Sequence, residues 1–189
     1  MRRMGDSNER HLLRSELCAG SEELMAYKHS NGLVFGNWDR FHDGHKAALQ
    51  KAFELCETVL VVYTKALYHV QQSQETWGIE DIDFRRSVVE SHIDGVICAG
   101  GRVSYAVYDN LSDFLADVTS HDFDAVIVSD KDCGNCWART YPGKVQDLIS
   151  AGKSEPILES VDVVYMADGQ ALSSSKLRKR EKLGMPLGI

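Results

Sequence analysis

The sequence predicts an α/β protein of the Rossmann-like type, a three-layer sandwich around a mainly parallel sheet of about five strands. Apolar runs rich in β-branched residues, typical of strands covered on both faces, alternate with amphipathic segments of helical length. This alternation implies right-handed βαβ crossovers and therefore parallel strands. One domain is expected, because 189 residues with 43% hydrophobic content can bury one sizeable core.

The first half of the chain contains the clearest elements. Residues 33–35 form a short apolar strand, and residues 46–57 lack Gly and Pro and carry apolar side chains at helical spacing. The run 58–63 is apolar and rich in β-branched residues, as in a strand covered on both faces. Residues 79–91 are expected to form a helix, with Phe84 among the residues that face the core.

Strands and helices continue to alternate in the second half. The strand-like segments are 95–99, 103–108, 125–128 and 160–166. The helix-like segments are 111–118, 138–151 and 178–183, the last of which is basic. Residues 1–29 are polar and charged and are expected to be a tail or an appended helix, so that the folded domain comprises residues 30–189.

The net charge and the hydropathy of the chain limit the kinds of molecule that it is expected to bind. The formal net charge of −7 argues against general nucleic-acid binding. No apolar run approaches the roughly 18–20 residues that span a bilayer, and the N-terminal residues lack the apolar segment of a secretory signal. We therefore expect a cytoplasmic protein that binds neither nucleic acid nor membrane, and the sequence sets no expectation for its oligomeric state.

The cysteines do not indicate a disulfide scaffold, because five is an odd number in a chain of this length. Cys133 and Cys136 form a lone C-x-x-C without the second pair that a zinc site would need. Two ordinary thiols near a loop are the favoured interpretation, with a metal or redox role as the alternatives.

The most informative stretch is 34–45, V-F-G-N-W-D-R-F-H-D-G-H. It passes from an apolar strand through Gly36 to a helix N-terminus, where unpaired N–H groups and the positive end of the helix dipole attract phosphate. His42 and His45 are expected on one side of the helix start, and each imidazole can donate a hydrogen bond to a phosphate oxygen. Gly44 between them leaves room for a ligand to approach the backbone.

Two other interpretations of this stretch remain open. Two exposed histidines at a helix cap would need no ligand. A metal site is the other alternative, and it would use Asp39, His42, Asp43 and His45. The metal site lacks an obvious further ligand elsewhere in the chain, so no metal bound directly by the protein is expected.

A second candidate segment lies near the C-terminus and reads L-S-S-S-K-L-R over residues 172–178. Ser173, Ser174 and Ser175 offer hydroxyl groups and the N–H groups of a helix start. Residues 176–182 contain five basic residues and one acidic residue, a local charge of +4 that suits a polyphosphate. The alternative is a solvated helix capped by serine.

Together the two segments resemble the nucleotidyltransferase superfamily with the H-x-G-H motif. Its signature, G-x-[ST]-F-D-x-x-H-x-G-H, is matched by Gly36, Trp38, Asp39, His42, Gly44 and His45. Its second hallmark, an I-S-S-T-R-I-R-like segment, is matched by residues 172–178. The finer resemblance is to the archaeal and eukaryotic type of pantetheine-phosphate adenylyltransferase, whose D-R-L-H-D-G-H and L-V-V-S-x-E/D patterns are similar to residues 39–45 and 125–130.

This resemblance implies transfer of AMP from ATP to 4′-phosphopantetheine, with Mg²⁺ bound together with ATP. It implies catalytic roles for His45, His42, Lys65 and Arg178, with His45 as the hydrogen-bond donor to the transition state. The implied nucleotide-binding residues are Gly36, Asn37, Trp38, Asp39, His42, Gly44, His45, Ser129, Asp130, Ser173, Ser174, Ser175 and Arg178.

Two departures from the family pattern concern the substrates. Asn37 replaces the hydroxyl residue that would contact the acceptor phosphate, and Lys176 replaces an arginine, which keeps the charge but loses the bidentate fork. The alternatives are therefore a cytidylyltransferase, an adenylyltransferase with another phosphorylated acceptor, or a non-catalytic nucleotide-binding homologue.

Overall fold

The structure is a computed structural model that describes residues 27–65, 78–97, 102–110, 122–129 and 154–187, together with residues 113, 150 and 152. The strands are β1 (His29–Gly36), β2 (Cys56–Thr64), β3 (Val103–Tyr108), β4 (Ala125–Ser129) and β5 (Ile157–Val161). The helices are α2 (Asp43–Leu55), α4 (Ile82–His92), the π-helical turn η1 (Ile93–Ile97) and α7 (Ser174–Lys182). No helix in these ranges combines the length and the apolar character needed to cross a membrane.

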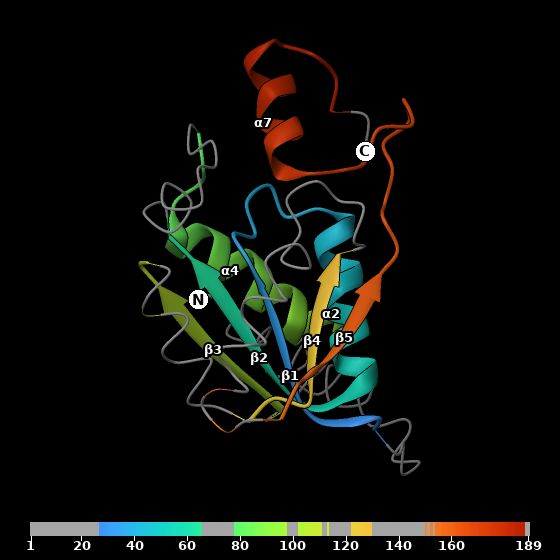
Figure 1. Cartoon of the computed structure of the whole chain (residues 1–189). Helices are drawn as coiled ribbons and strands as arrows, with labels where there is room; N and C mark the ends of the chain where they lie inside the picture. The colour runs from blue at the N-terminus through green and yellow to red at the C-terminus, as the bar shows by residue number, and fades with distance from the viewer. Residues whose placement is uncertain are drawn as a thin grey trace, which may run out of the picture.

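The five strands form one parallel sheet in the order β3-β2-β1-β4-β5, with β1 at its centre (Figure 1). In register, Leu33 of β1 lies opposite Leu60 of β2 on one side and Val126 of β4 on the other. From β1 the chain continues to β2 and β3 on one side of the sheet, and it later forms β4 and β5 on the other side, so the strand order reverses at β1. Ligands of such sheets bind outside the carboxyl ends of the strands at this reversal point, which places the end of β1 at the expected binding position.

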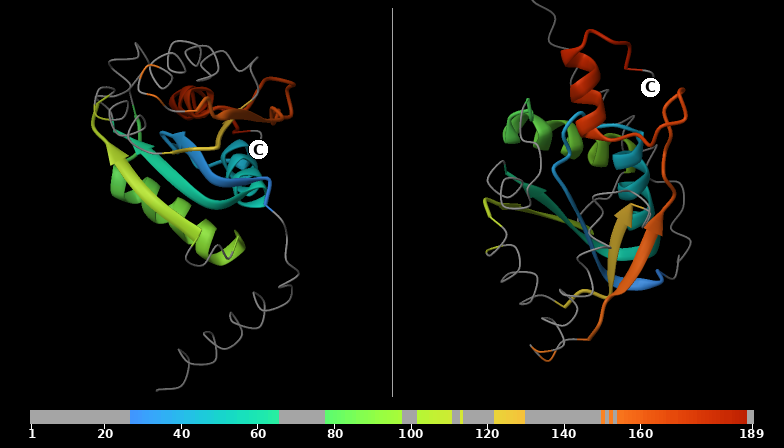
Figure 2. Two further views of the ribbon diagram at one scale, coloured as in Figure 1. Left: turned by 60° about the horizontal axis from the view of Figure 1, so that its bottom comes forward. Right: turned by 45° about the horizontal axis from the view of Figure 1, so that its top comes forward.

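Both faces of the sheet are buried. One face packs with α2 and α4 in a core that includes Val34, Val61, Leu49 and Val89, and the two helices lie on the same side of the sheet (Figure 2). Side chains alternate between faces along a strand, so Leu33, Val62 and Val126 point to the other face. They are also fully buried. The Rossmann-like α/β prediction with a parallel five-stranded sheet is confirmed.

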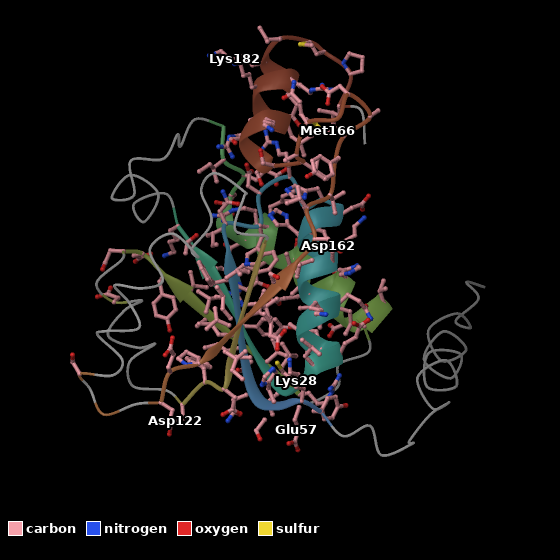
Figure 3. The ribbon with its side chains drawn as sticks, turned by 45° about the vertical axis from the view of Figure 1, so that its right-hand side comes forward. Lys28, Glu57, Asp122, Asp162, Met166 and Lys182 are labelled. Carbon is pink, nitrogen blue, oxygen red and sulfur yellow. The ribbon has the colours of Figure 1, made fainter. Side chains whose placement is uncertain are left out.

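Helix α7 lies beyond the carboxyl ends of the strands. Figure 3 shows Met166 and Lys182 at the end of the molecule opposite Lys28 and Glu57, which lie at the amino ends of β1 and β2. A separate small apolar cluster packs α7 against its own flanking segments, and it comprises Met166, Leu172 and Leu177 with Val164 and Leu187 packed against it. The sheet and the C-terminal helix therefore enclose the binding position from two sides.

Several element predictions need correction. Residues 95–97 are not a strand but part of η1, which extends α4. A short apolar run is compatible with either element, and Val96 is 66% exposed, so it has no covering layer that would favour a strand. The last strand ends at Val161 instead of Met166, and Phe84 is 54% exposed instead of facing the core. Most of the predicted helices 111–118 and 138–151 lies outside the described residues.

Candidate active site

The two histidines meet at the start of α2, next to the carboxyl end of the central strand. His42 is the N-cap residue and His45 is the third residue of the helix. Their rings stack with centroids 3.8 Å apart and planes inclined by 17°. The prediction that both imidazoles lie on one side of the helix start is confirmed.

The hydrogen bonding of His45 selects its tautomer. The His42 N–H donates to His45 Nδ1 at 3.4 Å, so a neutral His45 carries its proton on Nε2 and presents that atom as a donor. The ring lies between Trp38 and Phe41, at centroid distances of 5.2 and 5.9 Å. Burial, with a smaller contribution from His42, holds the pKa of His45 well below its usual value. His45 is therefore a neutral hydrogen-bond donor in a preorganised position.

His42 is also held neutral. It is 8% exposed, and burial lowers its pKa to about 4. Its Nδ1 atom is buried and has no hydrogen-bond partner among the residues that the structure describes. A buried polar atom without a partner costs free energy, which an anion or a water bound at this helix end would recover.

These neutral imidazoles predict a pH-dependent stability. His42 titrates at about 4 in the folded protein and near its ordinary 6.5 when unfolded. Between these values the unfolded chain binds more protons, so the free energy of unfolding should fall as the pH falls from 6.5 towards 4. His42 alone should contribute up to about 3 kcal/mol. Urea unfolding at stepped pH should show a shallower decline for His42→Gln than for the wild type, and parallel declines would contradict the assignment.

Asp39 joins the loop after β1 to α7. It is fully buried, and its carboxylate accepts hydrogen bonds from Arg178 Nη1, from Arg40 Nη1 at 2.9 Å and from the Glu80 N–H at 3.0 Å. Ser174 Oγ donates to the Asp39 carbonyl at 2.6 Å. The two predicted motifs, which are more than a hundred residues apart in the chain, are thus in direct contact through buried groups.

A second ion pair, which lies closer to the surface, also joins the loop after β1 to α7. Arg40 donates to both carboxylate oxygens of Glu181, from Nε at 3.0 and 3.2 Å and from Nη2 at 2.7 Å. The Arg40 N–H donates to Glu80 at 2.9 Å. Sequence reasoning missed Arg40, Glu80 and Glu181, because no local pattern signals an ion pair between residues so far apart.

Arg85 was also missed. It is 2% exposed and donates to three backbone carbonyls beneath the loop, those of Asn37, Thr64 and Glu80. The sequence does contain a pattern that could have identified Arg85 as a buried residue. Positions 85, 89 and 93 recur at helical spacing, and the latter two, Val89 and Ile93, are fully buried, so position 85 shares the inward stripe.

The first predicted motif is assembled around the loop after β1. Trp38 is 1% exposed and its Nε1 donates to the Val62 carbonyl at 2.8 Å, so its ring is part of the core. The Asn37 carboxamide oxygen accepts from the Asp39 N–H at 3.1 Å, which leaves its amino group as a donor. Gly36 is the last residue of β1.

The other predicted site residues are less closely tied to the histidines. Ser173 is the N-cap of α7, and its Oγ lies 3.3 Å from that of Ser175. Lys65 follows β2 and pairs with Asp109 at 2.6 Å, with both side chains substantially exposed. Ser129 ends β4. Asp130, Cys133 and Cys136 lie outside the described residues.

Comparison with known proteins adds an independent line of evidence. No protein-family model matches the chain. Phosphopantetheine adenylyltransferase of Methanothermobacter thermautotrophicus is 28% identical over 162 residues, which cover 83% of this chain and 88% of the relative. That of Methanosarcina barkeri is 28% identical over 151 residues, 78% of this chain and 86% of the relative.

The chain is thus similar to archaeal phosphopantetheine adenylyltransferases over most of its length. The resemblance predicted from its two motifs is confirmed. Among solved structures, a bifunctional NMN adenylyltransferase/ADP ribose pyrophosphatase from Francisella tularensis aligns with a TM-score of 0.56 and 13% identity, over 83% of this chain and 43% of that protein. This likeness shows that the fold is shared beyond the archaeal adenylyltransferases.

Proposed function

We propose that this protein is a nucleotidyltransferase that moves AMP from ATP to 4′-phosphopantetheine, with dephospho-coenzyme A and pyrophosphate as products. The observation that carries the proposal is the stacked pair of neutral histidines at the N-terminus of α2, beside the carboxyl end of the central strand. A helix N-terminus with two imidazole donors suits a phosphate chain. The archaeal relatives supply the substrate class.

In the proposed reaction, a phosphate oxygen of the acceptor attacks the α-phosphorus of ATP. The new P–O bond forms as the bond to the bridging oxygen breaks, and pyrophosphate leaves with the electron pair. The nucleophile is already an anion, so no strong base is needed, and catalysis depends on positioning and on charge stabilisation. His45 Nε2–H would donate to an α-phosphate oxygen as its negative charge grows.

Other residues would hold the two ends of the substrate. His42 and the serines of residues 173–175 are proposed to bind the β- and γ-phosphates. The Asn37 amino group would donate to the acceptor phosphate in place of the usual hydroxyl. Lys65 could exchange its exposed partner Asp109 for a phosphate, because exposed ion pairs are weak.

Arg178 and Mg²⁺ would supply further positive charge to the phosphates of ATP. Arg178 is paired with Asp39, so part of its charge is already neutralised by the protein. No group of three or more His, Cys, Asp or Glu side chains in the described part of the chain could hold a metal ion. Mg²⁺ would therefore enter as part of the MgATP substrate, bound to phosphate oxygens.

A panel of substrates tests the proposal. Pyrophosphate release should be measured with ATP, CTP, GTP and UTP, each against 4′-phosphopantetheine, nicotinamide mononucleotide and phosphocholine. We expect turnover with ATP and 4′-phosphopantetheine. Preference for CTP with phosphocholine would indicate a cytidylyltransferase, and ATP binding without release for any acceptor would indicate a non-catalytic homologue.

Gly44 provides a further prediction for phosphate binding. A Cβ at this position would lie 3.2 Å from His42 Cε1 and Nδ1, so Gly44→Ala should shift the His42 ring by a few tenths of an ångström and disturb its stacking on His45. We expect about tenfold weaker ATP binding by calorimetry, the effect of losing one charge-assisted hydrogen bond. Gly95→Ala is the matched control, since a Cβ there meets nothing within 4 Å. Equal affinities for the two variants would refute the role of Gly44.

A further inference from the structure

Arg85 is a buried cation beside the candidate active site that belongs to neither motif. Its Nε donates to the Glu80 carbonyl at 2.9 Å, and its Nη1 donates to the Thr64 carbonyl at 3.1 Å and to the Asn37 carbonyl. These carbonyls belong to the segment before α4, the end of β2 and the loop after β1. One guanidinium thus joins three chain segments at the carboxyl edge of the sheet.

We propose that Arg85 is a positioning residue for phosphate transfer, which acts by fixing the peptide between Asn37 and Trp38. The inference rests on the proposed function. In a trans peptide the carbonyl and the following N–H point in opposite directions, and the structure contains no cis peptide among its described residues. By holding the Asn37 carbonyl, Arg85 turns the Trp38 N–H away from α4. Asn37 also carries the proposed contact of the acceptor phosphate, its side-chain carboxamide, whose oxygen accepts from the Asp39 N–H at 3.1 Å.

The backbone of this loop needs such a constraint. Trp38 and Arg40 have φ values of +56° and +48°, in the left-handed region that residues other than glycine rarely adopt. Conformations of this kind persist only where the surroundings determine them. Arg85 of α4 holds the Asn37 carbonyl by a hydrogen bond, and Ser174 of α7 holds the Asp39 carbonyl in the same way.

The choice of arginine has a physical reason. A buried cation must be compensated by hydrogen bonds, and the planar guanidinium directs its donors along fixed, divergent lines. A lysine ammonium is a single point charge and cannot reproduce these directions. Burial lowers the pKa of Arg85, although Asp39, Glu80 and Asp81 oppose the shift. The free-energy cost of burying this cation is consistent with a group whose role is to hold the loop in its conformation.

Arg85→Gln and Arg85→Lys test the inference, and Arg86→Gln is the matched control. Arg86 is the next residue of α4, is 39% exposed and pairs with Glu90 at 3.0 Å. We expect Arg85→Gln to lower kcat by about 100-fold, because a displacement of about 1 Å costs that much in a positioned reaction. Arg85→Lys should recover part of the loss, while Arg86→Gln should match the wild type. Circular dichroism and thermal melting report on the fold of each variant.

The outcomes separate the possible explanations. Folded Arg85 variants with normal kcat, or a loss no greater than that of Arg86→Gln, would overturn the inference. So would failure of both Arg85 variants to fold, since Arg85 would then be a determinant of the whole fold. If the wild type releases no pyrophosphate with any acceptor, the proposed function is wrong. The role of Arg85 is then tested by measuring the affinity for ATP. Arg85→Lys should bind ATP about tenfold more weakly than Arg86→Gln does. Equal affinities of the two variants for ATP would reject the role.

Discussion

Replacing His45 with alanine should lower kcat by about 100- to 1,000-fold, the typical effect of removing one preorganised donor to a developing oxyanion. The proton of the neutral imidazole is on Nε2, because Nδ1 accepts from the His42 N–H. Contacts with Trp38 and Phe41 hold the ring in place, so the proposed donor would need no reorganisation when charge builds on the α-phosphate. Steady-state pyrophosphate release with ATP and 4′-phosphopantetheine is the measurement.

The Michaelis constant for ATP should change much less than kcat, because the hydrogen bond strengthens chiefly in the transition state. His29→Ala is a suitable control. His29 lies at the opposite end of β1, where it hydrogen-bonds Glu159 at 2.9 Å, and its loss should leave kcat unchanged. Near-normal turnover of a folded His45→Ala variant would eliminate His45 as the transition-state donor.

Replacing Asp39 with alanine should destabilise the protein by about 3–5 kcal/mol. Asp39 is fully buried and Arg178 is 4% exposed. Removal of the carboxylate takes the Asp39 partner away from the buried Arg178 guanidinium, and it also removes an acceptor for Arg40 and for the Glu80 N–H. The free energy of unfolding in urea is the appropriate measurement. Asp43→Ala is the control, since Asp43 is 64% exposed and should cost less than about 1 kcal/mol.

A double-mutant cycle isolates the contribution of the ion pair. Arg178→Met removes the cation and keeps much of the side-chain volume, so the double variant Asp39→Ala/Arg178→Met contains no uncompensated buried charge. Its destabilisation should be smaller than the sum of the two single effects by about 2 kcal/mol, the range found for residues in contact. Additive effects would show that Asp39 and Arg178 act independently.

The sequence by itself determined the local features of this protein. The apolar runs around Val34, Val61 and Ile127 predicted buried parallel strands, because a strand covered on both faces has no polar alternation. The spacing of His42 and His45 predicted that both rings lie on one side of a helix start, although His42 is the extended N-cap residue and not part of the helix. The two motifs together indicated the resemblance to the archaeal adenylyltransferases.

Only the tertiary structure decided how these parts are held together. The contacts of Asp39 with Arg178, of Arg40 with Glu181 and of Arg85 with the Asn37 carbonyl join residues 48 to 141 positions apart. No local pattern encodes such pairs, because they depend on where α4 and α7 dock on the sheet. The same reason explains the error at residues 95–97: whether a short apolar run becomes a strand or extends a helix is decided by the layer that covers it.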